Sequence, residues 1–147
     1  MEHWFYHLEH TTLESALPTL LEKTLAKGWR ARVQCADASA MKGLDRYLWT
    51  YRKDSFLPHG RDDEPMVDSH PIVLSAKAAM ASEDIIFLIG GAQQGDFSPN
   101  IKRCVTLVDS RDDHGRAVAR ARWAKAKEDG VEVSYWRQND NGAWGKV

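Results

Sequence analysis

The sequence predicts an α/β fold, a three-layer α/β/α sandwich in which helices cover both faces of a central sheet. Short apolar runs that are typical of strands alternate along the chain with longer segments of helical periodicity. With 147 residues, 43% of them hydrophobic, the chain is large enough to bury a core. Because no repeat, linker or low-complexity tract divides it, we expect a single domain over residues 1–147.

Apolar runs, alternating or continuous, predict six strands, at residues 4–8, 29–35, 71–75, 85–89, 104–108 and 131–136. The runs at 71–75 and 85–89 are typical of buried strands, and Gly90 and Gly91 end the second of them. Residues 54–68 are rich in charge, glycine and proline, so we expect a loop there. Residues 95–102 are ambiguous and have room for a short helix.

The first helix is expected directly after the first strand. Five leucines recur at helical spacing between residues 13 and 25, which indicates an amphipathic helix. Thr11 or Thr12 can cap its start, and Gly28 ends it. Pro18 falls inside this pattern, so it either bends the helix or marks its true start.

A segment rich in aromatic residues follows the second predicted helix, which Asp37 or Ser39 can cap. Residues 49–59 include three aromatics, a leucine and a proline, and Ser55, Pro58 and Gly60 argue against a continuing helix. Loops usually run over the surface and are polar. An aromatic loop therefore either folds under its own domain or binds another protein, because aromatic side chains anchor interfaces.

The third predicted helix, residues 112–129, carries a basic stripe around a tryptophan. Spacings of four, three and four place one set on a single face: Arg116, Arg120, Trp123 and Lys127. Arg122 and Lys125 add charge at the flanks. The opposite face, expected to lie close to the sheet, is Ala117, Val118, Ala121 and Ala124. A basic stripe is usually a solvated face, but this one also suits an acidic peptide with an apolar end, because arginine can hold a carboxylate through two parallel hydrogen bonds.

Composition and motifs bear on several other kinds of site. The formal net charge of −1 does not favour nucleic-acid binding by the surface as a whole. Cys35 and Cys104 lie in apolar segments without metal-site spacing, so we expect reduced core thiols and neither a metal nor a cofactor. Four tryptophans in or near strands are expected to be core or edge packing: Trp4, Trp29, Trp136 and Trp144.

Motifs for catalysis and for export are not found in the sequence. It contains neither G-x-S-x-G nor H-E-x-x-H, so we expect no catalytic residue. His59 is expected to be a structural residue that hydrogen-bonds the aromatic loop. No secretory signal and no apolar run of membrane-spanning length is evident, so a cytoplasmic protein is expected.

Several stretches, in order along the chain, resemble the chi subunit of bacterial DNA polymerase III. The longest runs from Leu48-Trp49-Thr50-Tyr51 to Asp54-Ser55-Phe56-Leu57-Pro58-His59. Shorter ones lie at residues 5–8, 28–30, 33–35, 119–123 and 134–136, so the resemblance covers nearly the whole chain. It implies a Rossmann-like domain with a mixed, mostly parallel sheet. It also implies a non-catalytic accessory subunit of the DNA polymerase III holoenzyme in DNA replication.

The resemblance implies two binding surfaces as well. The chi family binds the C-terminal tail of single-stranded DNA-binding protein, which is acidic and ends in phenylalanine, and the matching positions here are Arg116, Arg120, Trp123 and, less securely, Val108. In the same family the aromatic loop docks the psi subunit of the clamp loader, which implies contacts from Trp49, Tyr51, Phe56, Leu57 and Pro58. The protein would thus be an adaptor, a monomer within a hetero-oligomer, that reaches DNA only indirectly.

Two other functions remain open on the sequence alone. Residues Gly90 to Gly95 follow an apolar strand, where phosphate loops often lie, and could belong to a small α/β enzyme or nucleotide-binding domain. That loop lacks both G-x-G-x-x-G and a following Gly-Lys-Ser/Thr. A binding module for some other acidic partner would keep the basic helix without requiring a terminal phenylalanine.

Overall fold

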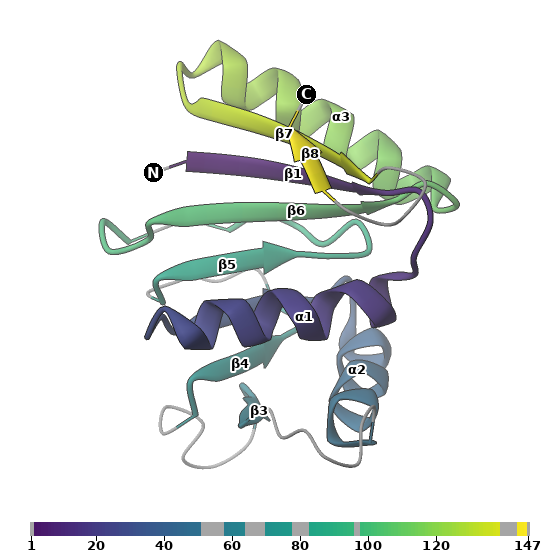
Figure 1. Cartoon of the computed structure of the whole chain (residues 1–147), viewed down its shortest axis with the longest axis vertical. Coiled ribbons are helices and arrows are strands. Elements are labelled where there is room, and N and C mark those ends of the chain that lie inside the picture. The colour runs from purple at the N-terminus through teal and green to yellow at the C-terminus, as the bar shows by residue number, and fades with distance from the viewer. Residues whose placement is uncertain are drawn as a thin grey trace.

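The computed structural model describes residues 2–50, 58–63, 70–77, 83–95, 98–138 and 144–146. Within these residues, eight strands form one sheet and three helices pack on it (Figure 1). The strands are β1 (Glu2–Leu8), β2 (Ala31–Gln34), β3 (His59–Arg61), β4 (Ile72–Ser75), β5 (Ile85–Leu88), β6 (Arg103–Asp109), β7 (Glu132–Gln138) and β8 (Trp144–Lys146). The helices are α1 (Leu13–Ala26), α2 (Ala38–Thr50) and α3 (Asp113–Glu128).

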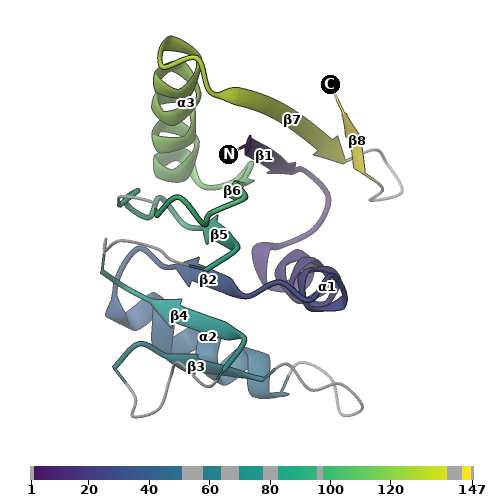
Figure 2. The same ribbon diagram turned by 90° about the vertical axis from the view of Figure 1, so that its left-hand side faces the viewer.

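The sheet is mixed and mostly parallel, which confirms the predicted fold class. Its strand order is β3-β4-β2-β5-β6-β1-β7-β8, and the β7–β8 pair is antiparallel while the other neighbours are parallel. α1 and α3 lie on opposite faces of this sheet (Figure 2). Side chains of α1 and α2 share one hydrophobic cluster with Val33 and Leu74, whereas α3 places Trp123 against Phe5 on the other face.

The first helix forms as its leucine pattern predicts. Thr12 is its N-cap, and the Thr12 side-chain oxygen accepts a hydrogen bond from the backbone N–H of Ser15 at 3.1 Å. Leu17 and Leu21 are fully buried against the sheet. Pro18 therefore does not mark the start of the helix, because α1 begins at Leu13 and continues through it.

Two strands and one turn differ from what the sequence suggests. β3 lies inside the segment expected to be a loop, and β8 contains Trp144 beyond the last predicted strand. Each has three residues, too few for an alternating pattern to be recognised. The described residues between 95 and 102 contain no helix; instead the backbone N–H of Ile101 donates to the Ser98 carbonyl at 3.2 Å.

The cysteines have the structural role that the sequence predicts, and His59 is buried beside α2, while its hydrogen bond to the aromatic loop stays a prediction. Cys35 and Cys104 are buried free thiols, and burial raises the pKa of each to about 12, so neither is a reactive thiolate at neutral pH. His59 is buried, with Nε2 at 3.0 Å from Asp45 Oδ1 of α2. None of the helices in the described residues has the length and apolar character needed to cross a membrane.

Candidate functional site

Helix α3 positions the basic stripe, and a precise cap fixes where the helix begins. Asp112 is the N-cap, and its Oδ1 accepts a hydrogen bond from the backbone N–H of Gly115 at 3.0 Å. A Cβ at position 115 would lie 2.4 Å from Asp112 Oδ2, so this cap requires glycine there. Asp113 in the first turn and Lys127 in the last turn complement the helix dipole.

The face of α3 that packs on the sheet is not the one predicted from its small residues. The buried residues are Gly115, Ala119 and Ala126, whereas Ala117, Val118, Ala121 and Ala124 are exposed or half-buried. Arg122 is also turned inward, where its Nη1 donates to Thr106 Oγ1 at 3.1 Å and its Nη2 to the Ala92 carbonyl at 2.6 Å. Alanines occur around much of this helix, so side-chain size could not predict which face packs on the sheet. The orientation of the helix is set instead by the buried acceptors that hydrogen-bond with Arg122.

The basic stripe borders a groove between α3 and the strands β1, β6 and β7. This groove has a volume of about 400 Å³. It is lined by Phe5, His7, Val108, Arg116, Ala119, Arg120, Trp123 and Tyr135. All four residues that the family resemblance selects, Arg116, Arg120, Trp123 and Val108, are thus brought together on one surface. We call this surface the peptide groove.

The apolar wall of the peptide groove is held in place by contacts within the protein. The Trp123 ring meets Phe5 edge to face, with centroids 5.1 Å apart, and meets Tyr135 in the same way at 5.8 Å. Lys127, the last member of the predicted stripe, lies with Nζ 4.9 Å from the centroid of the same ring. The wall therefore exists before any ligand binds.

The charge of the peptide groove is positive. Arg116 and Arg120 are exposed, and no carboxylate is among the described residues that line the groove. Arg116 Nη1 lies 3.8 Å from Asp113 Oδ1, a long and exposed contact of little energy. Within the described part of the chain, Arg120 makes no ion pair. Both guanidinium groups can therefore bind an anion.

A histidine–tyrosine pair on the floor of the groove was missed by the sequence analysis. His7 Nδ1 lies 2.6 Å from the Tyr135 hydroxyl, and His7 Nε2 is buried with no hydrogen-bond partner among the described residues. Burial lowers the pKa of His7, which favours the neutral ring. Alternation along β1 places Phe5 and His7 on one face, but the sequence does not give the strand order that brings Tyr135 and Val108 beside them.

The aromatic segment is only partly within the described residues. Trp49, in the last turn of α2, is 50% exposed, and its ring centroid lies 4.5 Å from that of His59. Pro58 is half-buried. Three of the predicted contact residues, Tyr51, Phe56 and Leu57, lie outside the described residues.

Replacing Trp49 by alanine is expected to lower the free energy of unfolding by about 1 kcal/mol or less, because half of this side chain is already in water. Its neighbour Leu48 is 1% exposed, so Leu48→Ala should cost about 2–5 kcal/mol. Urea unfolding of both variants measures the contrast. A loss from Trp49→Ala as large as that from Leu48→Ala would show that Trp49 serves the core instead of a surface.

The glycine pair after β5 does not have the surroundings of a phosphate site. Gly90 and Gly91 have positive φ angles of 60° and 77°, and a Cβ on Gly91 would lie 2.8 Å from the His114 ring, so this turn packs closely against the start of α3. A groove of about 470 Å³ lies beside Gly90, and among the described residues of its lining Glu14 is the one that carries a charge. A carboxylate repels a phosphate, so this geometry does not support the nucleotide-binding alternative.

Comparisons with known proteins agree with the resemblance seen in the sequence. The sequence model of the family described as "DNA polymerase III chi subunit, HolC" matches residues 1–134. A probable DNA polymerase III subunit chi of Rickettsia prowazekii is 20% identical over 149 residues, covering 97% of this chain and 89% of the relative. The DNA polymerase III subunit chi of Pseudomonas aeruginosa is 27% identical over 89 residues, covering 60% of this chain and 61% of the relative. The chain therefore belongs to the DNA polymerase III chi subunit family, and is an accessory subunit in DNA replication.

Proposed function

We propose that the protein is an adaptor of the DNA polymerase III holoenzyme that binds the acidic C-terminal tail of single-stranded DNA-binding protein in the peptide groove. The observation that carries this proposal is a preformed aromatic wall beside two arginines, with no carboxylate among the lining residues that the structure describes. A terminal phenylalanine would pack against Trp123, and the peptide's carboxylates would pair with Arg116 and Arg120. On this proposal the protein contributes no catalytic group of its own.

A second surface would connect the adaptor to the clamp loader through a psi-type subunit. Trp49 supports this part, because it is the large hydrophobic side chain that the described residues leave most exposed. A tryptophan buries roughly 150–250 Å² at an interface and is a frequent anchor there. Tyr51, Phe56, Leu57 and Pro58 complete the proposed contact set. Because the two surfaces lie on different helices, α2 and α3, one monomer can hold both partners and raise their local concentration.

The expected affinity for the tail peptide is modest. Each exposed charge pair contributes about 1 kcal/mol at most, and the aromatic wall contributes the larger share. A total near 8 kcal/mol corresponds to a Kd of roughly 1 μM. Because the charge pairs lie at the surface, the affinity should fall as ionic strength rises.

Replacing Arg120 by alanine is expected to weaken binding of a fluorescein-labelled acidic peptide with a C-terminal phenylalanine about fivefold, because an exposed charge pair of about 1 kcal/mol is lost. Fluorescence anisotropy measures the Kd. Lys125→Ala is the matched control, since Lys125 is a cation of the same helix that pairs with Asp129 at 2.8 Å and does not line the groove.

The same titration with a peptide that lacks its final phenylalanine separates two proposals. The adaptor proposal requires this shortened peptide to bind much more weakly than the complete one. If both peptides bind equally, the groove accepts acidic partners in general, which favours the module for another partner. If the wild-type protein binds neither peptide, the proposed tail site is wrong.

A further inference from the structure

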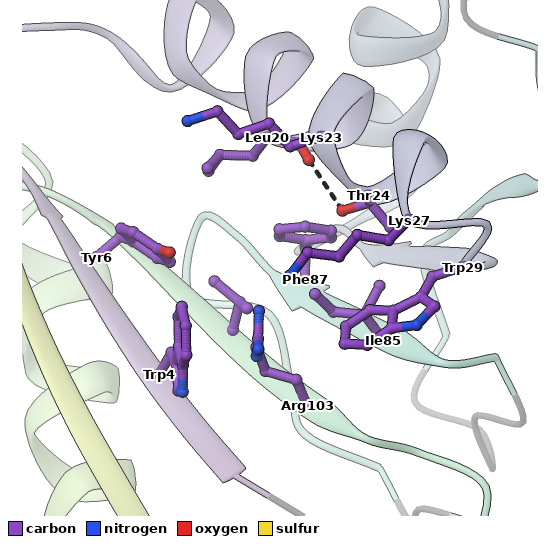
Figure 3. Close-up of a pocket in the computed structure, with 11 residues that line it drawn as sticks. Trp4, Tyr6, Leu20, Lys23, Thr24, Lys27, Trp29, Ile85, Phe87 and Arg103 are labelled. Carbon is purple, nitrogen blue, oxygen red and sulfur yellow. Dashed lines mark hydrogen bonds between the residues drawn. The ribbon is translucent and has the colours of Figure 1, made fainter.

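A second pocket lies on the opposite face of the sheet, between the carboxyl half of α1 and the first residues of β1, β5 and β6 (Figure 3). Its volume is about 210 Å³. Neither the peptide groove nor the surface around Trp49 shares a residue with it. Cations and tryptophans gather in its lining, which includes Trp4, Lys23, Lys27, Trp29 and Arg103. We call it the basic pocket.

Positive charges converge around one ring of the basic pocket. Lys27 Nζ lies 4.9 Å from the centroid of Trp29, and Arg103 Cζ and Lys102 Nζ each lie 5.3 Å from it. In Figure 3 the side chains of Lys27 and Arg103 point toward one another across the mouth of the pocket. Each of these contacts is a favourable cation–π interaction, and three cations beside one ring make the surroundings of this ring positive.

Carboxylates of the described residues neutralise only part of this charge. Asp84 Oδ1 is 2.9 Å from Lys102 Nζ, so that cation is paired. Glu2 Oε2 lies 3.7 Å from Arg103 Nε, which is too far for a hydrogen bond. The same Arg103 Nε is buried and has no hydrogen-bond partner among the described residues. Arg103 therefore retains an unmet donor beside the pocket.

The positive charges of Lys23, in the last turn of α1, and Lys27, its C-cap, are neutralised even less. Lys23 and Lys27 lie one turn apart on the same side of the helix, and both line the basic pocket. No carboxylate in the described part of the chain forms an ion pair with either of them. Together with Arg103 they make a local cationic surface on a protein whose formal net charge is −1. The basic pocket is therefore suited to an anionic group.

A row of aromatic rings continues from the basic pocket across β1, β7 and β8. Ring centroids are 5.2 Å apart for Trp4 and Trp136, 6.0 Å for Tyr6 and Trp136, and 4.7 Å for Tyr6 and Trp144. The three tryptophans are half-buried, and none of the described helices lies in front of β1 or β7 on this face (Figure 1). These four residues form the aromatic row: a series of planar rings beside a cationic pocket.

We propose that the basic pocket and the aromatic row bind single-stranded DNA. A phosphate would lie between Lys27 and Arg103, with Lys23 near the next phosphate, and bases would pack on the aromatic row. Cations beside aromatic platforms are the usual chemistry of single-strand binding, whereas an acidic peptide offers planar partners only where it carries aromatic side chains. The pocket is smaller than a typical small-molecule site of roughly 300–1,000 Å³, which favours one group of a longer ligand over a free nucleotide. This contact goes beyond the proposed adaptor function, in which DNA is reached only through a partner.

The test is fluorescence anisotropy of the full chain with a fluorescein-labelled oligothymidine at low salt. Each phosphate contact to a single strand contributes about 0.7 to the slope of log K against log salt, so its loss weakens binding about tenfold at about 50 mM salt. Lys23→Gln/Lys27→Gln should therefore weaken binding substantially and flatten the salt dependence. Lys42→Gln/Arg46→Gln removes the same charge from exposed positions of α2 outside the pocket and should bind like wild type.

A second arm tests the aromatic row. Trp136→Leu should weaken oligothymidine binding about tenfold, within the roughly 1–3 kcal/mol that stacking of one base contributes. Urea unfolding shows whether this variant folds; if it does not, the exposed lysine pair still tests the site. Arg120→Ala, which alters the peptide groove, should bind the oligonucleotide like wild type, so the two sites can fail independently.

Four outcomes would overturn the proposal. The first is no binding of oligothymidine by the wild-type protein at low salt. The second is an equal loss in the two paired charge variants, which would indicate unspecific attraction. The third is competition by duplex DNA as effective as that by unlabelled single strands, which would exclude base stacking. The fourth is equally effective competition by an acidic peptide, which would assign the pocket to a protein partner.

Discussion

Trp123→Ala is expected to weaken binding of the acidic, phenylalanine-ended peptide about a hundredfold, equivalent to about 2.8 kcal/mol. The reason is that Trp123 forms the wall of the peptide groove and is itself packed on Phe5 and Tyr135. Truncation of Trp123 removes the surface against which the peptide's terminal phenylalanine ring would pack. The peptide would then be held only by the exposed charge pairs that its carboxylates form with Arg116 and Arg120. Fluorescence anisotropy with the labelled peptide measures the change in Kd.

Two controls make this result specific to the wall of the groove. Trp123→Tyr keeps an aromatic face at the same position and should bind within about fivefold of wild type, less than 1 kcal/mol. Trp29→Ala removes another half-buried tryptophan, on the opposite face of the sheet, and should leave the peptide affinity unchanged. Equal weakening by Trp29→Ala would mean that the loss reflects general destabilisation and not the groove.

Acidification from pH 6.5 to pH 4 should remove roughly 3 kcal/mol of stability through a single residue, His3. Its ring is 2% exposed, and burial first, then the charge of Arg122, lowers its pKa from 6.5 to about 4. Below pH 6.5 the unfolded chain binds a proton at this residue and the folded chain does not. The stabilisation is thus complete above pH 6.5 and is lost as the pH falls toward 4, at about 1.4 kcal/mol per pH unit.

The hydrogen bonds around Thr106 are compatible with a neutral His3 ring. Arg122 Nη1 donates to Thr106 Oγ1, so the threonine hydroxyl can donate its own proton to His3 Nε2, 3.0 Å away. A protonated His3 would instead direct a second donor and a second positive charge at this group. When the threonine hydroxyl donates to it, the ring nitrogen accepts, and only the neutral imidazole can do so.

Urea unfolding at several pH values between 4 and 7.5 measures this effect. His3→Gln should have a flatter dependence of unfolding free energy on pH than the wild type, even if it is less stable at pH 7. His10→Gln is the matched control at an exposed position and should keep the wild-type dependence. Parallel curves for His3→Gln and wild type would show that other groups cause the acid sensitivity.

The elements that the sequence predicts well are those with both periodicity and end signals. α1 combines five regularly spaced leucines with the Thr12 cap, and α3 lies between an aspartate cap and Gly130, so both were located closely. β3 and β8 have only three residues each and form because neighbouring strands offer hydrogen bonds, a tertiary effect that no local pattern records.

The candidate site shows the same division between local and tertiary information. Helical spacing alone placed Arg116, Arg120 and Trp123 on one face, and the structure shows them bordering one groove. Spacing could not reveal that Arg122 would turn inward, because that depends on acceptors supplied by β6 and by the turn at Ala92. Nor could it identify the floor of the groove, which depends on which strands are neighbours.

The strand order also has a consequence for how the chain is made. β1 lies between β6 and β7, so Glu2 pairs with both Arg103 and Glu132. A ribosome must therefore complete most of the polypeptide before this first strand finds either neighbour. Such long-range pairings close slowly and leave a nascent chain with exposed apolar surface. The peptide groove needs Phe5 and His7 as well as α3 and Tyr135, so it cannot assemble until Tyr135 has been synthesised.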